Sequence, residues 1–272
     1  MASETTISSA RKAYLLSVRR RERFIIIMRY AILIGLVGLW ELAARVGWID
    51  PFITSCPSRV AATVARLLED GELFTHIGVT LFETVAGFLI GTAAGTLIAA
   101  AMWWSPAACR ILDPYLVILN ALPKIALGPV LIVWIGAGIG SIIVMAVLIS
   151  LVVTIVTVLT GFLDITGEKQ LLMRTLGASK MQIFTLVVLP AAVPTMIAAL
   201  KISVGMSWVG VIVGEYLVSQ AGLGYLIVYG GQVFRMDLVM GSTAVLCVCA
   251  ALMYLLVAAM EKRLNRARAH GG

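Results

Sequence analysis

Residues 164–190 read DITGEKQLLMRTLGASKMQIFTLVVLP, a polar stretch that passes into an apolar one. They interrupt a chain of 272 residues that otherwise consists largely of long apolar segments. The composition is 61% hydrophobic and only 13% charged, whereas soluble domains average about 25% charged residues. This composition indicates an integral membrane protein. A charged stretch with its own helix signals in such a chain is expected to be a docking surface rather than a plain loop.

Apolar windows of about 20 residues recur along the chain, and a helix of that length crosses a hydrocarbon core roughly 30 Å thick. Pro123, Lys124 and Pro129 fall inside the third window, but backbone breaks are tolerated where a helix bundle surrounds them. The sequence therefore predicts an all-α, polytopic membrane protein with about six crossings. The predicted ranges are 26–47, 77–103, 113–136, 140–162, 188–212 and 240–260.

The Lys and Arg residues indicate the orientation, because cytoplasmic loops carry an excess of positive charge. Both termini and the stretch 164–190 are therefore predicted to be cytoplasmic. The net charge of +7 is attributed to this asymmetry and to anionic membrane lipid, and nothing points to nucleic acid. The cations on this side are Arg11, Lys12, Arg19, Arg20, Arg21, Arg23, Arg29, Arg110, Lys169, Arg174, Lys180, Lys262, Arg263, Arg266 and Arg268, against Arg45, Arg59, Arg66 and Arg235 opposite.

Several kinds of chemistry have no residues to support them. The four cysteines form no disulfide framework, and two histidines make a metal site improbable. The phosphate-binding pattern G-x-x-x-x-G-K-[ST] is absent, so hydrolysis of ATP by that route is not expected. The basic N-terminal region lacks the features of a cleavable signal peptide. We therefore do not expect an enzyme, and we expect the chain itself to bind no cofactor.

The chain divides into four predicted regions. A short external helix is expected after Pro57-Ser58-Arg59, because apolar residues from Val60 onward recur at helical spacing. The regions are a basic cytoplasmic segment (1–25, amphipathic or partly disordered), the first span with an external segment (26–75), a core (76–262) and a cytoplasmic tail (263–272).

Gly87, Gly91 and Gly95 recur every four residues in the second predicted span. Such a series allows a neighbouring helix to approach closely. It is explained either by packing inside the bundle or by a seam with a second copy of the chain.

The stretch 164–190 has the signals of two short helices. Gly177 can end the first helix by adopting a left-handed conformation. Ser179 stands three residues before Gln182, which predicts a capping box that opens the second helix. Leu172 and Leu176 are expected to share an apolar side with Ile183 and Phe184. The order is therefore helix, bend, helix, followed by a span that starts near Val188.

This spacing resembles the signature of the permease subunits of ABC importers. Gly177 is followed by the nine residues 178–186, then Val187, Val188, Leu189 and Pro190, which matches the glycine half of that signature. The first half departs from it, because the segment 171–173 is Leu-Leu-Met where the family has Glu-Ala-Ala.

Three further motifs follow in the order typical of one permease subfamily. They are FETVAGFLIG (82–91), LPKIALGPVLIVWIGAG (122–138) and GEYLVSQAGLGYLI (214–227). Over residues 35–260 the chain resembles the permeases of nitrate, sulfonate, taurine and thiamine-precursor importers. The resemblance implies a type I importer permease in the bacterial cytoplasmic membrane, with a second permease copy, two ATPase subunits that hold ATP and Mg, and an external solute-binding protein.

Within this resemblance the stretch 164–190 corresponds to the helix that couples the permease to its ATPase. ATP binding would close the ATPase pair and bias the permease between two states. Glu168 is a candidate substitute for the missing acid of the signature. The predicted coupling residues are Glu168, Arg174, Leu176, Gly177, Ala178, Ser179 and Gln182.

Lys124 and Lys201 are cations within apolar stretches, which by default suggests a translocation pathway. Alternatively, each lysine snorkels or pairs with an acid. Ser207 and Trp208 are candidates for a gate, or equally for ordinary bundle packing.

Glu215, Gly222 and Gly224 are predicted to lie on the face that meets the binding protein, with a solvated interfacial carboxylate as the alternative. Glu83 and Glu41 are interpreted as interfacial.

The leading interpretation is a permease for a small solute, and the two lysines favour an anion such as nitrate, a sulfonate or taurine. A pyrimidine or flavin-like compound is the alternative within the same family. A secondary transporter or channel driven by an ion gradient would instead predict paired carboxylates deep in the membrane. A membrane scaffold or receptor would leave the spacing around Gly177 unexplained.

Overall fold

The computed structural model describes residues 9–165 and 167–271. Within these ranges every regular element is helical. Contacts divide the chain into two units, residues 1–62 and 63–272, which are described separately.

The first unit contains α1 (Ser9–Val46), α2 (Pro51–Thr54) and the beginning of α3 (Pro57–Glu69). The span predicted at 26–47 lies in α1, where residues 20–46 are apolar enough to cross a membrane. The predicted lead-in is helical from Ser9 onward, while residues 1–8 and the side chains of Arg11, Lys12 and Arg19 lie outside the described residues. The helix predicted after Pro57-Ser58-Arg59 is confirmed as α3.

Glu41 connects two helices of this first unit. Its carboxylate accepts hydrogen bonds from the backbone N–H and the hydroxyl of Ser58, at 3.0 and 2.9 Å, and it pairs with Arg45 at 2.8 Å. These contacts fix the chain where it leaves α1 and enters α3.

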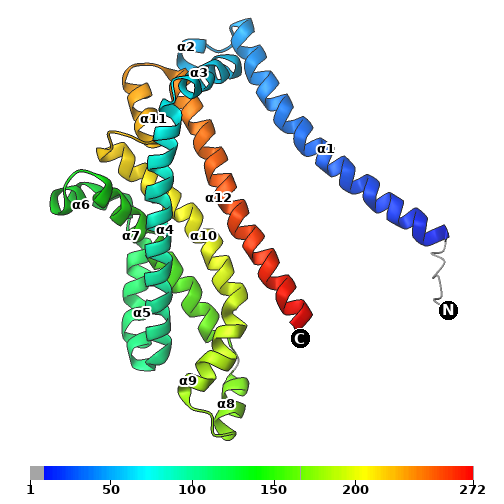
Figure 1. The fold of residues 1–272 in the computed structure, drawn as a ribbon, viewed down its shortest axis with the longest axis vertical. Coiled ribbons are helices and arrows are strands. Elements are labelled where there is room, and N and C mark those ends of the chain that lie inside the picture. Colours follow the sequence, from blue (N-terminus) through cyan, green and yellow to red (C-terminus); the bar gives the residue numbers. More distant parts are fainter. Residues whose placement is uncertain (1–8, 166, 272) are drawn as a thin grey trace. The chain divides into compact units, whose positions relative to one another are not determined.

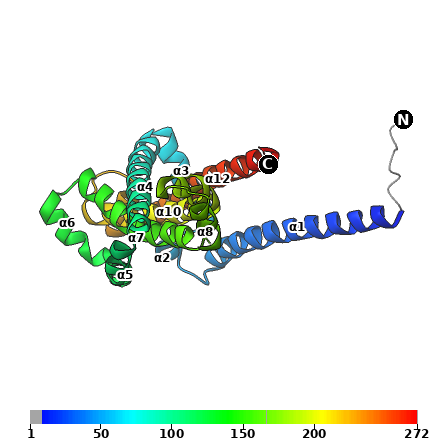
Figure 2. The same cartoon turned by 90° about the horizontal axis from the view of Figure 1, so that it is seen from below.

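The second unit is a bundle of long helices (Figure 1). It contains α4 (Glu72–Trp104), α7 (Ile139–Leu163), α10 (Leu189–Val218) and α12 (Met236–Gly271). Helices α4, α7 and α10 pack on one another, as Figure 2 shows from below. Helix α12 packs on α10 and on the short α11 (Leu223–Gln232). The side chains of residues 264–272, including Arg266 and Arg268, lie outside the described residues.

Five helices of the described residues are long and apolar enough to cross a membrane, or up to six if a bent pair is one span. Five of the six predicted crossings coincide with these helices. Their ranges are Arg20–Val46, Glu72–Trp104, Ile139–Leu163, Lys180–Val218 and Met236–Arg263.

The crossing predicted at 113–136 is interrupted near the prolines that fall inside it. Helix α5 (Pro106–Ala121) is followed by a 3₁₀ turn, η1 (Lys124–Leu127), and by α6 (Gly128–Ile135), with a bend of 87°. Leu122 is extended, as expected for a residue before proline. Pro123 has no N–H to continue the helical ladder. Leu122 and Pro123 therefore end α5.

The glycine series of α4 faces α7. A Cβ atom added at Gly87 would lie 2.5 Å from the Cβ of Ala146, and one added at Gly95 would lie 2.8 Å from the Cβ of Thr154. Gly91 would meet the hydroxyl of Ser150 in the same way. The structure therefore shows packing inside the bundle, which explains the glycines without a second copy of the chain.

Candidate functional site

The stretch 164–190 forms two short helices at one end of the second unit, opposite to α11 (Figure 1). They are α8 (Gly167–Thr175) and α9 (Lys180–Ile183), followed by a π-helical turn, η2 (Phe184–Val188), that leads into α10. The order of helix, bend, helix and span predicted from the sequence is confirmed.

Gly177 ends α8 as predicted. Its φ of +79° is left-handed, and its N–H donates to the carbonyl of Arg174 at 3.0 Å. The N–H of Ala178 reaches back to the carbonyl of Met173 at 2.9 Å. These bonds satisfy carbonyls that the end of a helix leaves open.

The predicted capping box of α9 is also confirmed. The hydroxyl of Ser179 accepts from the backbone N–H of Gln182 at 3.3 Å, and the side chain of Gln182 accepts from the N–H of Ser179 at 2.7 Å. Because both ends of the bend are satisfied by local bonds, the angle between α8 and α9 is fixed by the sequence itself.

Aromatic side chains fasten this segment to the bundle. The ring of Phe184 lies 4.9 Å from that of Trp103 on α4 and 5.5 Å from that of Phe162 on α7, between centroids. The amine of Lys180 lies 5.5 Å from the centroid of Trp104 and donates to the Trp104 carbonyl. Ile183 is buried in the same cluster. The segment is therefore in direct contact with α4 and α7.

The predicted apolar side of the segment is divided in two, which corrects the sequence interpretation. Ile183 and Phe184 pack inward. Four other apolar side chains remain between 59% and 73% exposed. We call them the α8–α9 apolar patch: Leu171, Leu172, Leu176 and Met181.

Two polar candidates of this segment lie on α8. Glu168 is exposed and lies in the first turn of α8. The positive end of the helix dipole stabilises a carboxylate at that position. Arg174 lies in the last turn of the same helix. A contact of Glu168 with an ATPase stays a prediction.

Near the start of α11, Glu215 is buried and both of its carboxylate oxygens accept hydrogen bonds. Its exposed fraction is 1%. One carboxylate oxygen accepts from the hydroxyl of Thr80 at 2.6 Å, and the other accepts from the backbone N–H of Gly224. The Thr80 hydroxyl in turn accepts from the N–H of Leu223 at 2.8 Å. A carboxylate that caps the start of α11 in this way is compensated for its burial by donors and by the helix dipole.

Gly222 and Gly224 let the chain pass close to this carboxylate. Gly222 has a φ of +119°, and an added Cβ would collide with the carboxyl group of Glu215. A Cβ at Gly224 would lie 2.7 Å from a Glu215 oxygen. All three residues are buried, so the alternative of a solvated carboxylate is wrong. A place for them at the face that meets a binding protein stays a prediction. They hold the α10–α11 turn.

Glu83 is a second buried acid, which the sequence analysis placed at an interface. Its exposed fraction is 0%. Among the described residues its carboxyl group has no hydrogen-bond partner other than the neighbouring Glu215, whose carboxylate is the acceptor. Glu83 also borders a cavity of about 310 Å³ together with Gly138 and Ser219. The interpretation of Glu83 as interfacial is therefore wrong.

A signal for this pair was present in the sequence. His76, Thr80 and Glu83 recur at spacings of four and three, and Gly87 continues the series. These positions share one face of a helix, so a stripe of polar and small residues faces the core of the bundle.

The pathway candidates have other partners. The amine of Lys201 pairs with a carboxylate oxygen of Glu261 at 2.9 Å, which is the alternative of pairing with an acid. Lys124 opens the turn η1 after the break and donates to the carbonyl of Asn120 at 3.3 Å. Ser207 is buried, and Trp208 packs against Phe88 of α4, as the packing alternative expects. A pathway role for these four residues stays a prediction.

Comparisons with known proteins agree with this architecture. Residues 87–270 match the family described as "Binding-protein-dependent transport system inner membrane component". The putative aliphatic sulfonates transport permease protein SsuC of Bacillus subtilis is 26% identical over 86% of this chain and 84% of its own length. The formylaminopyrimidine transport permease protein ThiX of Halalkalibacterium halodurans is 30% identical over 70% of this chain and 75% of its own length.

The fold is similar to that of a solved transporter. A chain of the MetNI methionine ABC transporter in inward facing conformations superposes with a TM-score of 0.57, at 20% identity, over 69% of this chain and 93% of that chain. This chain belongs to the inner-membrane permease family of binding-protein-dependent ABC importers, in the group of the sulfonate, taurine and thiamine-precursor permeases.

Proposed function

We propose that this chain forms the translocation pathway of an ATP-driven importer, with both termini and the α8–α9 segment in the cytoplasm. The α8–α9 segment is the coupling element that seats in an ATPase subunit. The single observation that carries this role is the α8–α9 apolar patch, which stands exposed on a bend fixed by Gly177 and the Ser179–Gln182 capping box. Contiguous exposed apolar surface is typical of a protein interface.

The contacts of Phe184 explain how such a docked segment does work. ATP and Mg bind to the two ATPase subunits, whose closure moves the seated α8–α9 segment. Phe184 is in contact with Trp103 and Phe162, so the motion reaches α4 and α7 without an intervening flexible linker. The two states of the pathway are then populated according to which ligand is bound. A second copy of the chain completes the pathway, and an external binding protein delivers the solute.

The solute is a small anion such as a sulfonate, taurine or nitrate. The name of the sulfonate relative supports this choice. Lys124, which has no ion pair among the described residues and lies at the break between α5 and α6, is the cation available to it. Lys201 is neutralised by Glu261 and contributes less. The alternative cargo is a pyrimidine or flavin-like compound, which the name of the ThiX relative supports.

One observation favours a second candidate, transport driven by an ion gradient. That class predicts paired carboxylates in the spans, and Glu83 and Glu215 form such a pair. Glu215, however, is already engaged by Thr80 and Gly224. Uptake that survives ATP depletion but stops with a protonophore would support this candidate. Uptake that stops only on ATP depletion supports the importer.

The coupling role is tested by Leu172→Asp. A charge in the centre of the apolar patch should lower the recovery of the ATPase with the affinity-tagged permease by about ten-fold, as for a central interface residue. Ile53→Asp is the matched control, because Ile53 is similarly exposed at 64% but lies on α2. Undiminished recovery with Leu172→Asp, at normal permease expression, would refute the docking role. ATPase activity stimulated by a loaded binding protein provides the second readout.

A further inference from the structure

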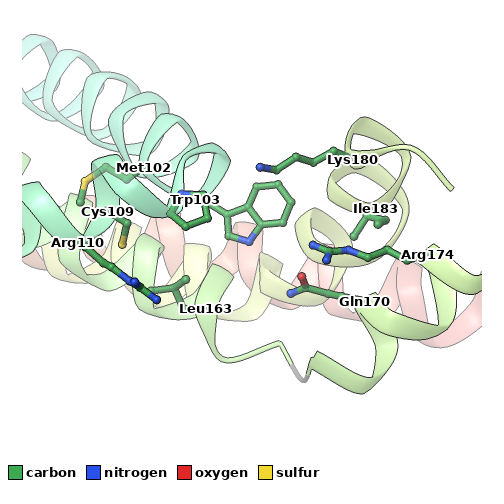
Figure 3. Close-up of a pocket in the computed structure, with 10 residues that line it drawn as sticks. Met102, Trp103, Cys109, Arg110, Leu163, Gln170, Arg174, Lys180 and Ile183 are labelled. Atoms are coloured by element: carbon green, nitrogen blue, oxygen red, sulfur yellow. The ribbon is translucent and has the colours of Figure 1, made fainter.

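A cavity of about 300 Å³ lies between the last turns of α4 and α7 and the α8–α9 segment. Figure 3 shows its lining. Arg110 reaches it from α5, Arg174 from α8 and Lys180 from α9. We call it the basic cavity. Its volume is at the lower end of the range of about 300–1,000 Å³ found for small-ligand sites.

The charges of the basic cavity are not balanced. None of its lining residues is acidic. In the part of the chain that the structure describes, Arg110, Arg174 and Lys180 form no ion pair. Three positive charges around one small space favour an anion there, because its charge offsets their mutual repulsion. The cavity is therefore suited to an anion.

The remaining walls are apolar. Met102 and Trp103 come from the end of α4, Leu163 from the end of α7, and Ile183 from α9. Both α4 and α7 are candidate spans, and Trp104 and Leu163 are their last residues. The cavity thus lies at the boundary between the apolar spans and the charged end of the molecule. A ligand that fits it has an anionic head and an apolar body.

We propose that the basic cavity binds the phosphate of an anionic phospholipid head group, with the acyl chains along the ends of α4 and α7. Arginine suits this task, because its planar fork donates paired hydrogen bonds to phosphate. Arg110 and Arg174 supply two such forks from different helices, and Gln170 adds an amide donor. Lys180 contributes charge while its amine stays on the carbonyl and ring of Trp104.

The position of Arg174 distinguishes this site from the interface with an ATPase. The sequence assigned Arg174 to that interface, but the side chain lines the cavity, whereas the α8–α9 apolar patch is exposed. A bound phosphate between Arg110 and Arg174 would join α5 to α8. Anionic lipid would then set the position of the coupling segment relative to the bundle.

The test uses the purified full-length chain in detergent and native mass spectrometry of single-lipid adducts. Wild type should bind phosphatidylglycerol in preference to phosphatidylcholine. Arg110→Gln should weaken the phosphatidylglycerol adduct about five-fold, and Arg110→Gln with Arg174→Gln about twenty-five-fold, because each basic side chain contributes about 1 kcal/mol. Lys169→Gln is the control, since Lys169 is an exposed cation of α8 outside the cavity.

Two further measurements separate loss of binding from loss of stability, and a lipid from a soluble phosphate compound. The melting temperature of each variant without lipid should equal that of wild type. If a glutamine variant is less stable, Arg110→Lys keeps the charge but loses the paired donors, so its binding should fall between those of wild type and Arg110→Gln. Equal adducts for wild type, Arg110→Gln and the double variant overturn the proposal. So does inorganic phosphate that binds as well as phosphatidylglycerol, because the site would then serve a soluble phosphate compound and not a lipid.

Discussion

The hydroxyl of Thr80 on α4 donates to the carboxylate of Glu215 on α10 over 2.6 Å, and both side chains are buried. The same hydroxyl accepts from the N–H of Leu223, the first residue of α11. One threonine thus connects three helices through a single oxygen atom. The carboxylate can remain buried because its donors are arranged before any solute or partner arrives.

Replacement of this threonine should be costly. Thr80→Val removes a donor to a buried carboxylate and leaves the N–H of Leu223 without an acceptor. We expect a loss of about 2–4 kcal/mol in the free energy of unfolding, because a bond to a charged group and a buried donor are both affected. Thermal unfolding of the purified chain measures it. Thr243→Val is the control, since Thr243 is exposed and bonds only within its own helix. Equal melting temperatures for the two variants would contradict the assignment.

The glycine at position 224 should tolerate no side chain. A methyl group there would lie 2.7 Å from an oxygen of Glu215 and displace the N–H that bonds to it. Gly224→Ala should therefore lower the melting temperature and the yield of folded protein. Gly205→Ala is the matched control within α10, because an added Cβ meets nothing within 4 Å. That control should gain up to about 1 kcal/mol from helix propensity. A stable Gly224→Ala variant would show that the turn is not constrained by Glu215.

The capping box of α9 should matter for coupling more than for folding. Ser179→Ala removes the cap at a cost of about 1 kcal/mol and loosens the bend between α8 and α9. We expect ATPase activity stimulated by the loaded binding protein to fall while uncoupled hydrolysis persists. Ser179→Thr keeps a hydroxyl cap and should behave as wild type. Full stimulation in Ser179→Ala would mean that the bend is held by packing alone.

The pair of Lys201 and Glu261 should behave as a structural unit. Lys201→Met alone leaves a carboxylate without its partner in a candidate span and should lower the melting temperature. The double variant Lys201→Met with Glu261→Gln removes both charges and should recover much of that loss. Transport by the double variant is expected to stay within about two-fold of wild type, because a pair that neutralises itself carries no pathway charge. Abolished transport in a well-folded double variant would restore Lys201 to the pathway.

Local features could be predicted from the sequence, because the interacting residues are near one another in the chain. The left-handed Gly177 and the bonds between Ser179 and Gln182 depend on residues at most a few positions apart. The contact of Thr80 with Glu215 joins residues 135 positions apart. No periodic pattern of one helix states which other helix it faces, so Glu215 could be placed near a span end but not buried.

The broken third crossing was visible in part. Pro123 and Pro129 signalled an interruption, but the size of the bend depends on how α6 packs on α7 and α10. The same holds for Ile183 and Phe184, which are similar to Leu172 and Leu176 in hydrophobicity. Ile183 and Phe184 face inward because the aromatic cluster around Trp103 receives them, whereas Leu172 and Leu176 stay exposed.

The glycine series of α4 has a mechanical consequence. At Gly87, Gly91 and Gly95 the backbone of α4 meets the side chains of α7 with no spare volume, so neither helix can slide or roll past the other. We therefore expect the two helices to move as one rigid pair. Any change of shape should then occur outside this rigid pair, for example at the kink at Leu122 and Pro123.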